Sequence, residues 1–242
     1  MTDAQRIKAE VSRHYAERVK ESAGCCGTDC CGTPSPSGHY PVEVLEQIPA
    51  GAVTFGSGNP VGMAGLRMGE VVLDLGSGAG LDCFIAGRGV GPSGSVVGVD
   101  FTQAMIDRAT ENAAELGMSN VSFKLGDIEA LPQEDDSVDV IISNCVINLA
   151  PDKAAVFREA FRVLRSGGRL VVSDIVLTRP ATAGEAQDMA LVTGCIAGSL
   201  PAEEYAATIR AAGFEDVSLE GEVEAAGTAK FWYSAAIRAT KP

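Results

Sequence analysis

EVVLDLGSGAGLDCFIAGRGVGPSGSVVGVD, residues 70–100, is the stretch that decides the fold of this chain. Its first apolar run, 71–73, is β-branched and aliphatic and leads to turn residues, which is typical of a buried strand. A glycine loop follows, then a predicted helix over about 81–88, and then a second buried strand over 95–99 that ends at Asp100. A strand, a glycine loop, a helix, a strand and an acid in this order are typical of a nucleotide-binding βαβ unit.

The spacing of the glycines separates this loop from two common phosphate-binding loops. Gly76, Gly78 and Gly80 form the pattern G-x-G-x-G, and Leu81 stands where a dinucleotide-binding fingerprint has its third glycine. The Gly-Lys-Ser/Thr ending of nucleotide hydrolases is also absent. The glycines would let backbone N–H groups approach a ligand, and Asp100 can accept both hydroxyls of a ribose. A glycine-rich turn in an unrelated α/β domain is the alternative.

The composition is that of a globular chain of 242 residues, with 46% hydrophobic residues and a formal net charge of −13. The length suits one α/β domain with additions. The negative charge argues against a surface for nucleic acid or for an anionic membrane. No apolar stretch is long enough to span a bilayer, and the first residues lack the apolar core of a signal peptide. We therefore expect a cytoplasmic protein with neither nucleic acid nor membrane as partner.

The chain has seven cysteines and only two histidines, which argues against histidine-based acid–base catalysis. In a reducing compartment thiols bind metals, catalyse or carry electrons more often than they form structural disulfides. Cys25, Cys26, Cys30 and Cys31 lie in CCGTDCCGTPSPSGHYP, residues 25–41, which has the composition of a loop. A structural zinc site is one interpretation, although adjacent cysteines chelate one tetrahedral ion poorly. Binding of a soft thiophile or disulfide exchange is the other interpretation.

The N-terminal residues predict an amphipathic helix over 3–21. Ile7, Val11, Tyr15 and Val19 recur every four residues, which places them on one helical face. Such a helix either covers a ligand site as a lid or packs on the flank of the domain. The sequence leaves both alternatives open.

The remaining sequence alternates between apolar runs and helical spacing, and this predicts an open sheet with helices on both faces. Further strands are expected at 121–125, 138–143, 170–176, 217–219 and 231–237, and further helices at 42–48, 102–117 with Thr102 as its cap, 151–165 and 201–212. The result is a Rossmann-like α/β fold with a mostly parallel, seven-stranded sheet. We divide the chain into an N-terminal helix and cysteine-rich loop, 1–50, and one domain over 51–242 with an insertion at about 178–200.

Three cysteines lie outside the cysteine-rich loop. Cys83 is in the first turn after the glycine loop, where a helix N-terminus favours a thiolate. Cys145 follows the strand 138–143, and Cys195 lies in the insertion after the next strand. The carboxyl ends of parallel strands meet at one edge of a sheet, so we expect these thiols beside the glycine loop. A single free cysteine is often only a small buried hydrophobe, but three at such positions favour a thiophilic site.

Four segments together resemble the arsenite S-adenosylmethionine (SAM) methyltransferases, which belong to the class I SAM-dependent methyltransferases. They are VVLDLGSGAGLDCFIA, VDVIISNCVINLAPDK, RLVVSDIVL and GCIAGSL, in this order and spacing. The resemblance implies the class I Rossmann-like fold and SAM as methyl donor. It implies cofactor contacts at Asp74, Gly76, Ser77, Gly78, Asp100, Phe101, Met105, Gly126, Asp127, Ile128 and Asn144. Asp127 would lie near the adenine amine, although it could also be a simple turn residue.

The resemblance further implies methylation of trivalent arsenic, with the arsenic lone pair attacking the methyl group. Cys145 and Cys195 would be the arsenic ligands, and Cys83 would be a third ligand or would form a disulfide during catalysis. Cys30 or Cys31 would relay electrons, with thioredoxin or glutathione as the reductant and arsenite or its thiol conjugate as the substrate. Relatives often have cysteine in the segment GCGNP, where this chain has serine at position 57.

Two other functions fit the same residues. The chain could methylate a quinone or another small molecule with the thiols incidental, or it could bind a metalloid or zinc without catalysis, as a sensor. The sequence does not decide how many methyl groups are added, and we expect the chain to act as a monomer.

Overall fold

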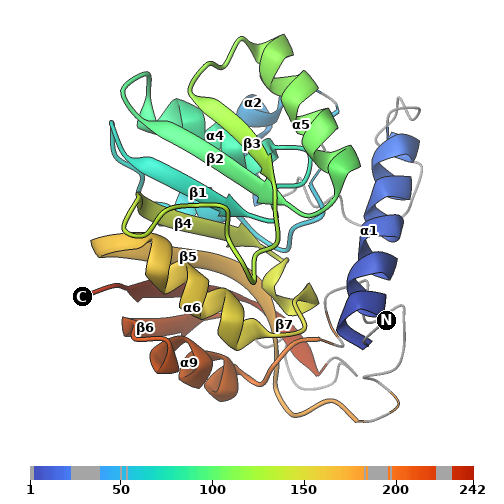
Figure 1. Cartoon of the computed structure of the whole chain (residues 1–242), viewed down its shortest axis with the longest axis vertical. Coiled ribbons are helices and arrows are strands. Elements are labelled where there is room, and N and C mark those ends of the chain that lie inside the picture. Colours follow the sequence, from blue (N-terminus) through green and yellow to red (C-terminus); the bar gives the residue numbers. More distant parts are fainter. Residues whose placement is uncertain are drawn as a thin grey trace.

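The structure, a computed structural model, describes residues 3–22, 39–49, 51–52, 54–182, 184, 196, 198–221 and 231–242. Its centre is a seven-stranded sheet in the order β3-β2-β1-β4-β5-β7-β6 (Figure 1). The strands are β1 (Val71–Leu75), β2 (Ser95–Asp100), β3 (Val121–Leu125), β4 (Val138–Asn144), β5 (Leu164–Leu177), β6 (Glu215–Glu220) and β7 (Trp232–Thr240). β7 pairs antiparallel with β5 and β6, and the other pairings are parallel. The predicted Rossmann-like fold with a mostly parallel sheet is confirmed.

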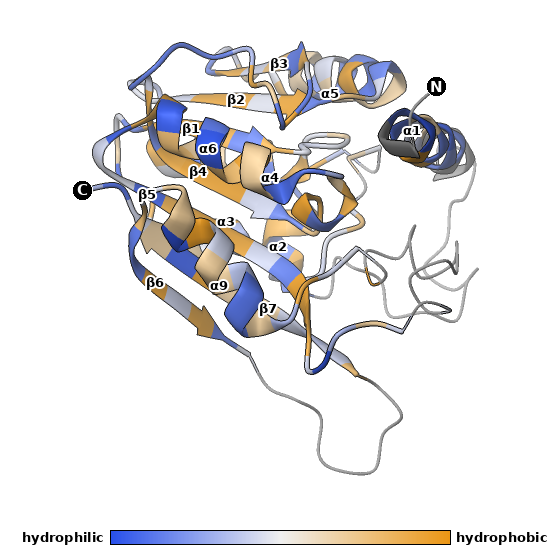
Figure 2. Ribbon diagram, turned by 60° about the horizontal axis from the view of Figure 1, so that its bottom comes forward, coloured by the Kyte–Doolittle hydropathy of each residue, from blue (hydrophilic) through white to orange (hydrophobic). Residues whose placement is uncertain are grey.

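β1 shows why the first strand can be read from the sequence. It is paired at both edges, with β2 and β4, and helices cover both faces of the sheet there. Val72 packs into the apolar cluster on one face of the sheet, and Leu73 and Leu75 pack into the cluster on the other. The apolar colouring of the central strands in Figure 2 follows from this two-sided burial.

Helices cover both faces of the sheet. The helices of the described residues are α1 (Asp3–Ser22), α2 (Val42–Leu45), α3 (Pro60–Ala64), α4 (Leu81–Val90), α5 (Gln103–Leu116), the 3-10 turn η2 (Ile147–Leu149), α6 (Lys153–Val163) and α9 (Ala202–Ala211). Residues of α3 and α4 belong to one core cluster, whereas those of α6 and α9 belong to the cluster on the opposite face. α1 stands apart from the sheet, beside α5 (Figure 1).

Apart from shifts of up to three residues at the ends of other elements, the structure differs from the sequence-based expectation in three places. The helix α3 was not predicted, although Asn59 caps it by accepting the N–H of Gly62 and Gly65 ends it with a φ of 56°. Thr102 is the N-cap of α5, but its side chain makes no capping hydrogen bond. β5 begins six positions before the expected Leu170, because residues from Leu164 onward already pair with β4.

Two predicted segments lie outside the described residues. Most of the cysteine-rich loop falls in 23–38, and most of the insertion falls in 185–195. The predictions for Cys30, Cys31 and Cys195 therefore lie outside the part of the chain that the structure describes. None of the helices in the described ranges combines the length and the apolar character that a bilayer-spanning helix needs.

Candidate active site

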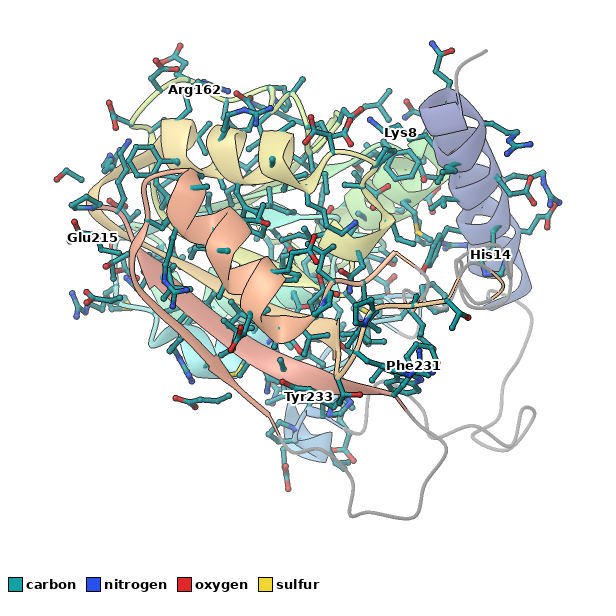
Figure 3. All side chains as sticks on the ribbon, turned by 90° about the horizontal axis from the view of Figure 1, so that it is seen from below. Lys8, His14, Arg162, Glu215, Phe231 and Tyr233 are labelled. Atoms are coloured by element: carbon teal, nitrogen blue, oxygen red, sulfur yellow. The ribbon has the colours of Figure 1, made fainter. Side chains whose placement is uncertain are left out.

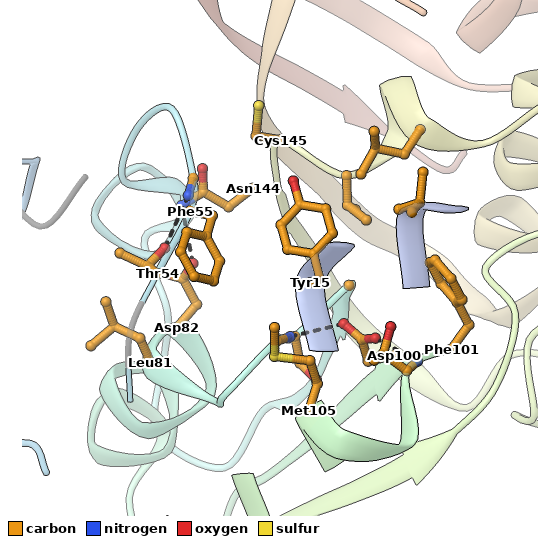
Figure 4. Close-up of a pocket in the computed structure, with 18 residues that line it drawn as sticks. Tyr15, Thr54, Phe55, Leu81, Asp82, Asp100, Phe101, Met105, Asn144 and Cys145 are labelled. Atoms are coloured by element: carbon orange, nitrogen blue, oxygen red, sulfur yellow. Dashed lines mark hydrogen bonds between the residues drawn. The ribbon is translucent and has the colours of Figure 1, made fainter. Parts of the chain in front are cut away.

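A pocket opens at the carboxyl edge of β1, β2 and β4 (Figure 4). Open parallel sheets bind ligands at this edge. Its lining comes from α1, the segment before α3, the glycine loop, the start of α5 and the turn after β4. The lining residues are Val11, Tyr15, Thr54, Phe55, Gly56, Gly76, Ser77, Gly78, Leu81, Asp82, Asp100, Phe101, Thr102, Met105, Asn144, Cys145, Val146 and Leu149.

The glycine loop between β1 and α4 forms the floor of this pocket. Gly76 has a φ of 71°, and a Cβ there would lie 2.3 Å from Cγ2 of Val146, so only glycine permits this close approach. The backbone N–H groups of Gly76 and Ser77 both donate to Val99 O, which fixes the loop against β2. The hydroxyl of Ser77 is buried and has no hydrogen-bond partner in the described part of the chain. A ligand in the pocket can supply that partner.

Asp100 is held rigidly at the end of β2. Its carboxylate accepts the N–H of Gly78 at 3.1 Å and the N–H of Thr102 at 2.8 Å. Burial raises the pKa of Asp100, and these two hydrogen bonds act in the opposite direction. The carboxylate therefore needs no rearrangement before it can accept hydroxyl groups of a ligand.

Asn144 joins the pocket to two other segments. Its Oδ1 accepts the N–H groups of Ser57 and Gly58 at 2.9 and 3.3 Å. Its Nδ2 donates to Gly58 O, to the hydroxyl of Tyr40 at 3.0 Å and to Oδ2 of Asp82 at 3.1 Å. The Tyr40 hydroxyl donates in turn to Oδ1 of Asp82 at 2.5 Å. The side chain of Asn144 thus fixes the residue that directly precedes Cys145.

Two carboxyl groups near the glycine loop favour a cationic ligand. Asp82 lines the pocket, and burial raises its pKa to about 6 against the opposing hydrogen bonds from Tyr40 and Asn144. Asp74 lies beneath the loop and is 2% exposed. Burial, and next the charge of Asp82, raise the pKa of Asp74 well above its ordinary value. A positive charge in the pocket would relieve the repulsion between these carboxylates.

The two described cysteines differ in their surroundings. Cys145 lines the pocket, has a left-handed φ of 60°, and packs in a small apolar cluster with Leu149, Ile175, Ile196 and Trp232. The N–H of Cys145 donates to the carbonyl of Ser173 on β5. Cys145 therefore lies at the pocket wall, in the turn after β4 (Figure 4).

Cys83 is completely buried, and it is not among the residues that line the pocket. Its Sγ donates to Oδ2 of Asp74 at 3.2 Å. Burial, followed by the charge of Asp74, raises the pKa of Cys83 well above its ordinary value. The expected thiolate at the helix N-terminus is therefore wrong for this structure, because desolvation and a carboxylate outweigh the helix dipole. Within the described ranges no group of three or more His, Cys, Asp or Glu side chains is arranged to hold a metal ion.

Comparison with known proteins finds several arsenite methyltransferases among the relatives. The family described as "Methyltransferase domain" matches residues 66–215. An arsenite methyltransferase of Halobacterium salinarum is 42% identical over 93% of this chain and 60% of its own length. An arsenic(III) S-adenosylmethionine methyltransferase from Chlamydomonas reinhardtii, known from a crystal structure, is 36% identical and superposes with a TM-score of 0.70 over 87% of this chain and 75% of that one. The chain belongs to the arsenite SAM methyltransferase family.

An arsenite methyltransferase of Aquipseudomonas alcaligenes matches in the same way, at 37% identity over 86% of this chain. The chain spans about 60% of the length of these curated arsenite methyltransferases. SAM is the methyl donor of the family, and the pocket fits it on three counts. The Ser77 hydroxyl has no partner among the described residues, the Asp100 carboxylate is positioned for ribose hydroxyls, and the carboxyl groups of Asp74 and Asp82 suit the cationic sulfonium and amino groups.

Most of the residues that the sequence predicts as cofactor contacts line the pocket of this arsenite SAM methyltransferase family member. Seven of them line it: Gly76, Ser77, Gly78, Asp100, Phe101, Met105 and Asn144. Asp74 lies below it, and Gly126, Asp127 and Ile128 follow β3 outside its lining. The carboxylate of Asp127 is bound by Lys8 of α1. A role for these last three residues in binding adenine stays a prediction.

Sequence analysis missed several residues of the site, and two of them left a readable signal. Leu81 and Asp82 directly follow the third glycine of the loop, so their place at the pocket follows from the βαβ unit itself. Gly56 approaches Asn144 so closely that a Cβ there would lie 2.2 Å from its side chain. Tyr40 left no local signal, because its partner Asp82 is 42 positions away.

α1 covers the pocket, which decides between the two roles that the sequence left open. Val11 and Tyr15 line the pocket, and the ring of Tyr15 meets that of Phe55 edge to face at 5.6 Å. Lys8 lies on the side of α1 that faces the domain (Figure 3), and its Nζ is 2.5 Å from carboxylate oxygens of both Asp127 and Glu129. These ion pairs hold the helix over the site.

We expect the substitution Lys8→Met to increase amide hydrogen exchange in α1 about fivefold, because it removes two partly buried ion pairs to the domain. The matched control is Arg13→Met, since Arg13 forms its ion pairs with Glu10 and Glu17 of the same helix. That control should leave the docking of α1 unchanged. Equal exchange rates in both variants, measured by mass spectrometry, would show that Lys8 does not hold the helix.

Proposed function

We propose that this chain transfers the methyl group of SAM to trivalent arsenic that is held by cysteine thiolates. The observation that carries the proposal is the position of Cys145, which lines the same pocket as the glycine loop and Asp100. Donor and acceptor sites of a direct transfer have to share one cavity. The arsenite methyltransferases among the relatives support arsenic as the acceptor.

Methyl transfer to arsenic suits a site that has no side chain placed as a general base. When bound, SAM supplies a methyl group on a positively charged sulfur. Trivalent arsenic is a soft acceptor that prefers thiolates, and it keeps a lone pair when three sulfurs bind it. The new As–C bond would form from this lone pair while the bond between the methyl carbon and the sulfonium sulfur breaks and its electron pair stays on sulfur in S-adenosylhomocysteine, so no proton leaves the arsenic and no general base is required. The transfer oxidises arsenic to the pentavalent state, and two electrons from thiols return it to the trivalent state.

The residues of the chain then have separable tasks. The glycine loop and Asp100 hold the cofactor, and Asp82 faces its positive charge. Tyr15 and Phe55 close the pocket from the side of α1 and exclude water. Because orientation accounts for much of the barrier in such transfers, this closure contributes by fixing the approach of arsenic to the methyl carbon.

Cys195 is the proposed second ligand of arsenic. Ile196, its neighbour in the sequence, packs in the apolar cluster of Cys145, which supports this role. Cys83 is the proposed third ligand or disulfide partner, and it would have to give up its hydrogen bond to Asp74. Cys30 or Cys31 would carry electrons from thioredoxin or glutathione. We further propose that the chain works as a cytoplasmic monomer, as its many thiols and its net charge suggest.

The experiment is an incubation of the purified chain with SAM, arsenite and glutathione, followed by arsenic speciation and by assay of S-adenosylhomocysteine. We expect both methylated arsenic and S-adenosylhomocysteine, and neither when arsenite is omitted. Binding of SAM and arsenite without turnover would instead favour a sensor. Turnover with a quinone acceptor but not with arsenite would favour a methyltransferase whose thiols are incidental.

A further inference from the structure

A second polar cluster lies on the far side of Cys145, outside the cofactor pocket. Its centre is Asp174 of β5, which is completely buried. One of its oxygens accepts Nδ2 of Asn148 at 2.7 Å and the N–H of Ile175 at 2.9 Å, and the other accepts the hydroxyl of Tyr205 at 3.1 Å. Keeping a carboxyl group away from water is unfavourable unless it is well partnered. The proposed transfer does not use this group.

Asn148 connects the cluster to the turn that carries Cys145. It lies in η2, three positions after Cys145, and is 3% exposed. Its Nδ2 donates both to Asp174 and to the carbonyl of Ile175, which ties η2 to the end of β5. Independently, the N–H of Cys145 donates to the carbonyl of Ser173 at 2.8 Å. The turn is therefore bound to β5 at both of its ends.

Asn148 also meets the segment that follows Cys195 in the sequence. A Cβ at Gly198 would lie 2.1 Å from Asn148 O, so the backbone there rests directly on this carbonyl. The same segment is bound to β5 through the N–H of Leu177, which donates to Leu200 O at 2.9 Å. It then continues into α9, whose Tyr205 reaches back to Asp174.

We propose that Asn148, Asp174 and Tyr205 form a positioning triad that fixes the turn bearing Cys145 against residues 198–200 and the start of α9, and so holds the thiol of Cys145 in place for trivalent arsenic. This inference rests on the proposed function. None of the three side chains lines the cofactor pocket, so they are positioning residues and not catalytic ones. The expected signature is a change in arsenite binding without a change in SAM binding.

The fluorescence of Trp232 can report the binding of arsenite directly. It is the chain's single tryptophan, and it packs in the apolar cluster of Cys145. Titration of the full chain with arsenite alone should change its fluorescence. With Asp174→Ala we expect the apparent dissociation constant and the KM for arsenite to rise about tenfold or more, which is the usual effect of losing a residue that orients a metal ligand. The dissociation constant for SAM should stay within about twofold, because the cofactor pocket is untouched.

Two related variants separate positioning from general destabilisation. Asp174→Asn keeps an acceptor for Asn148 and Ile175 and offers an amide to Tyr205, so it should restore arsenite KM to within about threefold of the wild type. Tyr205→Phe removes a single hydrogen bond, so it tests the triad even if Asp174→Ala does not fold. It should raise arsenite KM about threefold or more.

The control is Asn120→Ala. Asn120 donates two hydrogen bonds, to Gly87 O and Gly91 O, and lies before β3 at the opposite edge of the sheet. We expect it to lower thermal stability without changing the KM for arsenite. If the triad variants lower stability and leave arsenite KM unchanged, the inference is wrong. If the wild-type chain itself forms no methylated arsenic, the proposed function fails instead.

Discussion

Cys145→Ser should lower the formation of methylated arsenic by more than about 100-fold and leave the affinity for SAM within about twofold. Serine has nearly the shape of cysteine and tolerates the left-handed φ of 60° no worse. Its hydroxyl is a poor ligand for a soft metalloid, and it ionises far less readily than a thiol. The measurement is arsenic speciation at saturating SAM, together with calorimetric titration of SAM.

Cys83→Ser is the informative partner of this variant. Cys83 is a buried cysteine too, but it bonds to Asp74 beneath the pocket and does not line it. If Cys83 is only a core residue, this variant should lose stability and keep its methylation rate per folded molecule. A loss of methylation equal to that of Cys145→Ser would instead make it the third ligand. Full activity in Cys145→Ser would refute arsenic binding at this thiol.

Asp100→Asn should weaken SAM binding about 30- to 100-fold, because charge-assisted hydrogen bonds contribute roughly 1.5–3 kcal/mol each. The amide has the size of the carboxylate but only one acceptor oxygen, whereas Asp100 accepts two backbone N–H groups. In the variant, the NH₂ group of the amide therefore faces one of these two backbone N–H groups, so that two hydrogen-bond donors oppose each other. Asp107→Asn is the control, since Asp107 is exposed on α5, outside the pocket lining, and accepts a hydrogen bond from Gln103 of the same helix.

The same carboxylate gives SAM binding a pH dependence of known sign. Burial raises the pKa of Asp100 above its ordinary value. Hydroxyl donors and a cationic ligand bind the ionised form better, so the affinity of the wild type should fall as the pH is lowered through the acid range. Asp100→Asn should show a weaker pH dependence, which calorimetric titration at several pH values can measure. An unchanged dissociation constant in the variant would remove Asp100 from the cofactor site.

Local spacing made the first half of the fold predictable. The strand, the glycine loop and Asp100 follow one another within 31 residues, and each depends on near neighbours in the sequence. The contacts of Tyr40 and Lys8 could not be derived in this way, because their partners lie 42 and 119 or more positions away. Cys83 shows a third case, in which a local argument for a thiolate is overruled by burial and by Asp74.

The ion pairs of Lys8 with Asp127 and Glu129 constrain the order in which the site can assemble during protein synthesis. The helix that covers the pocket is synthesised before its ionic partners, which follow 119 and 121 positions later. Contacts this far apart in the chain form late, because a long loop has to close before they gain anything. During translation α1 therefore cannot form these two ion pairs until Asp127 and Glu129 have been added, so the full fixation of α1 over the cofactor pocket has to follow the synthesis of β3.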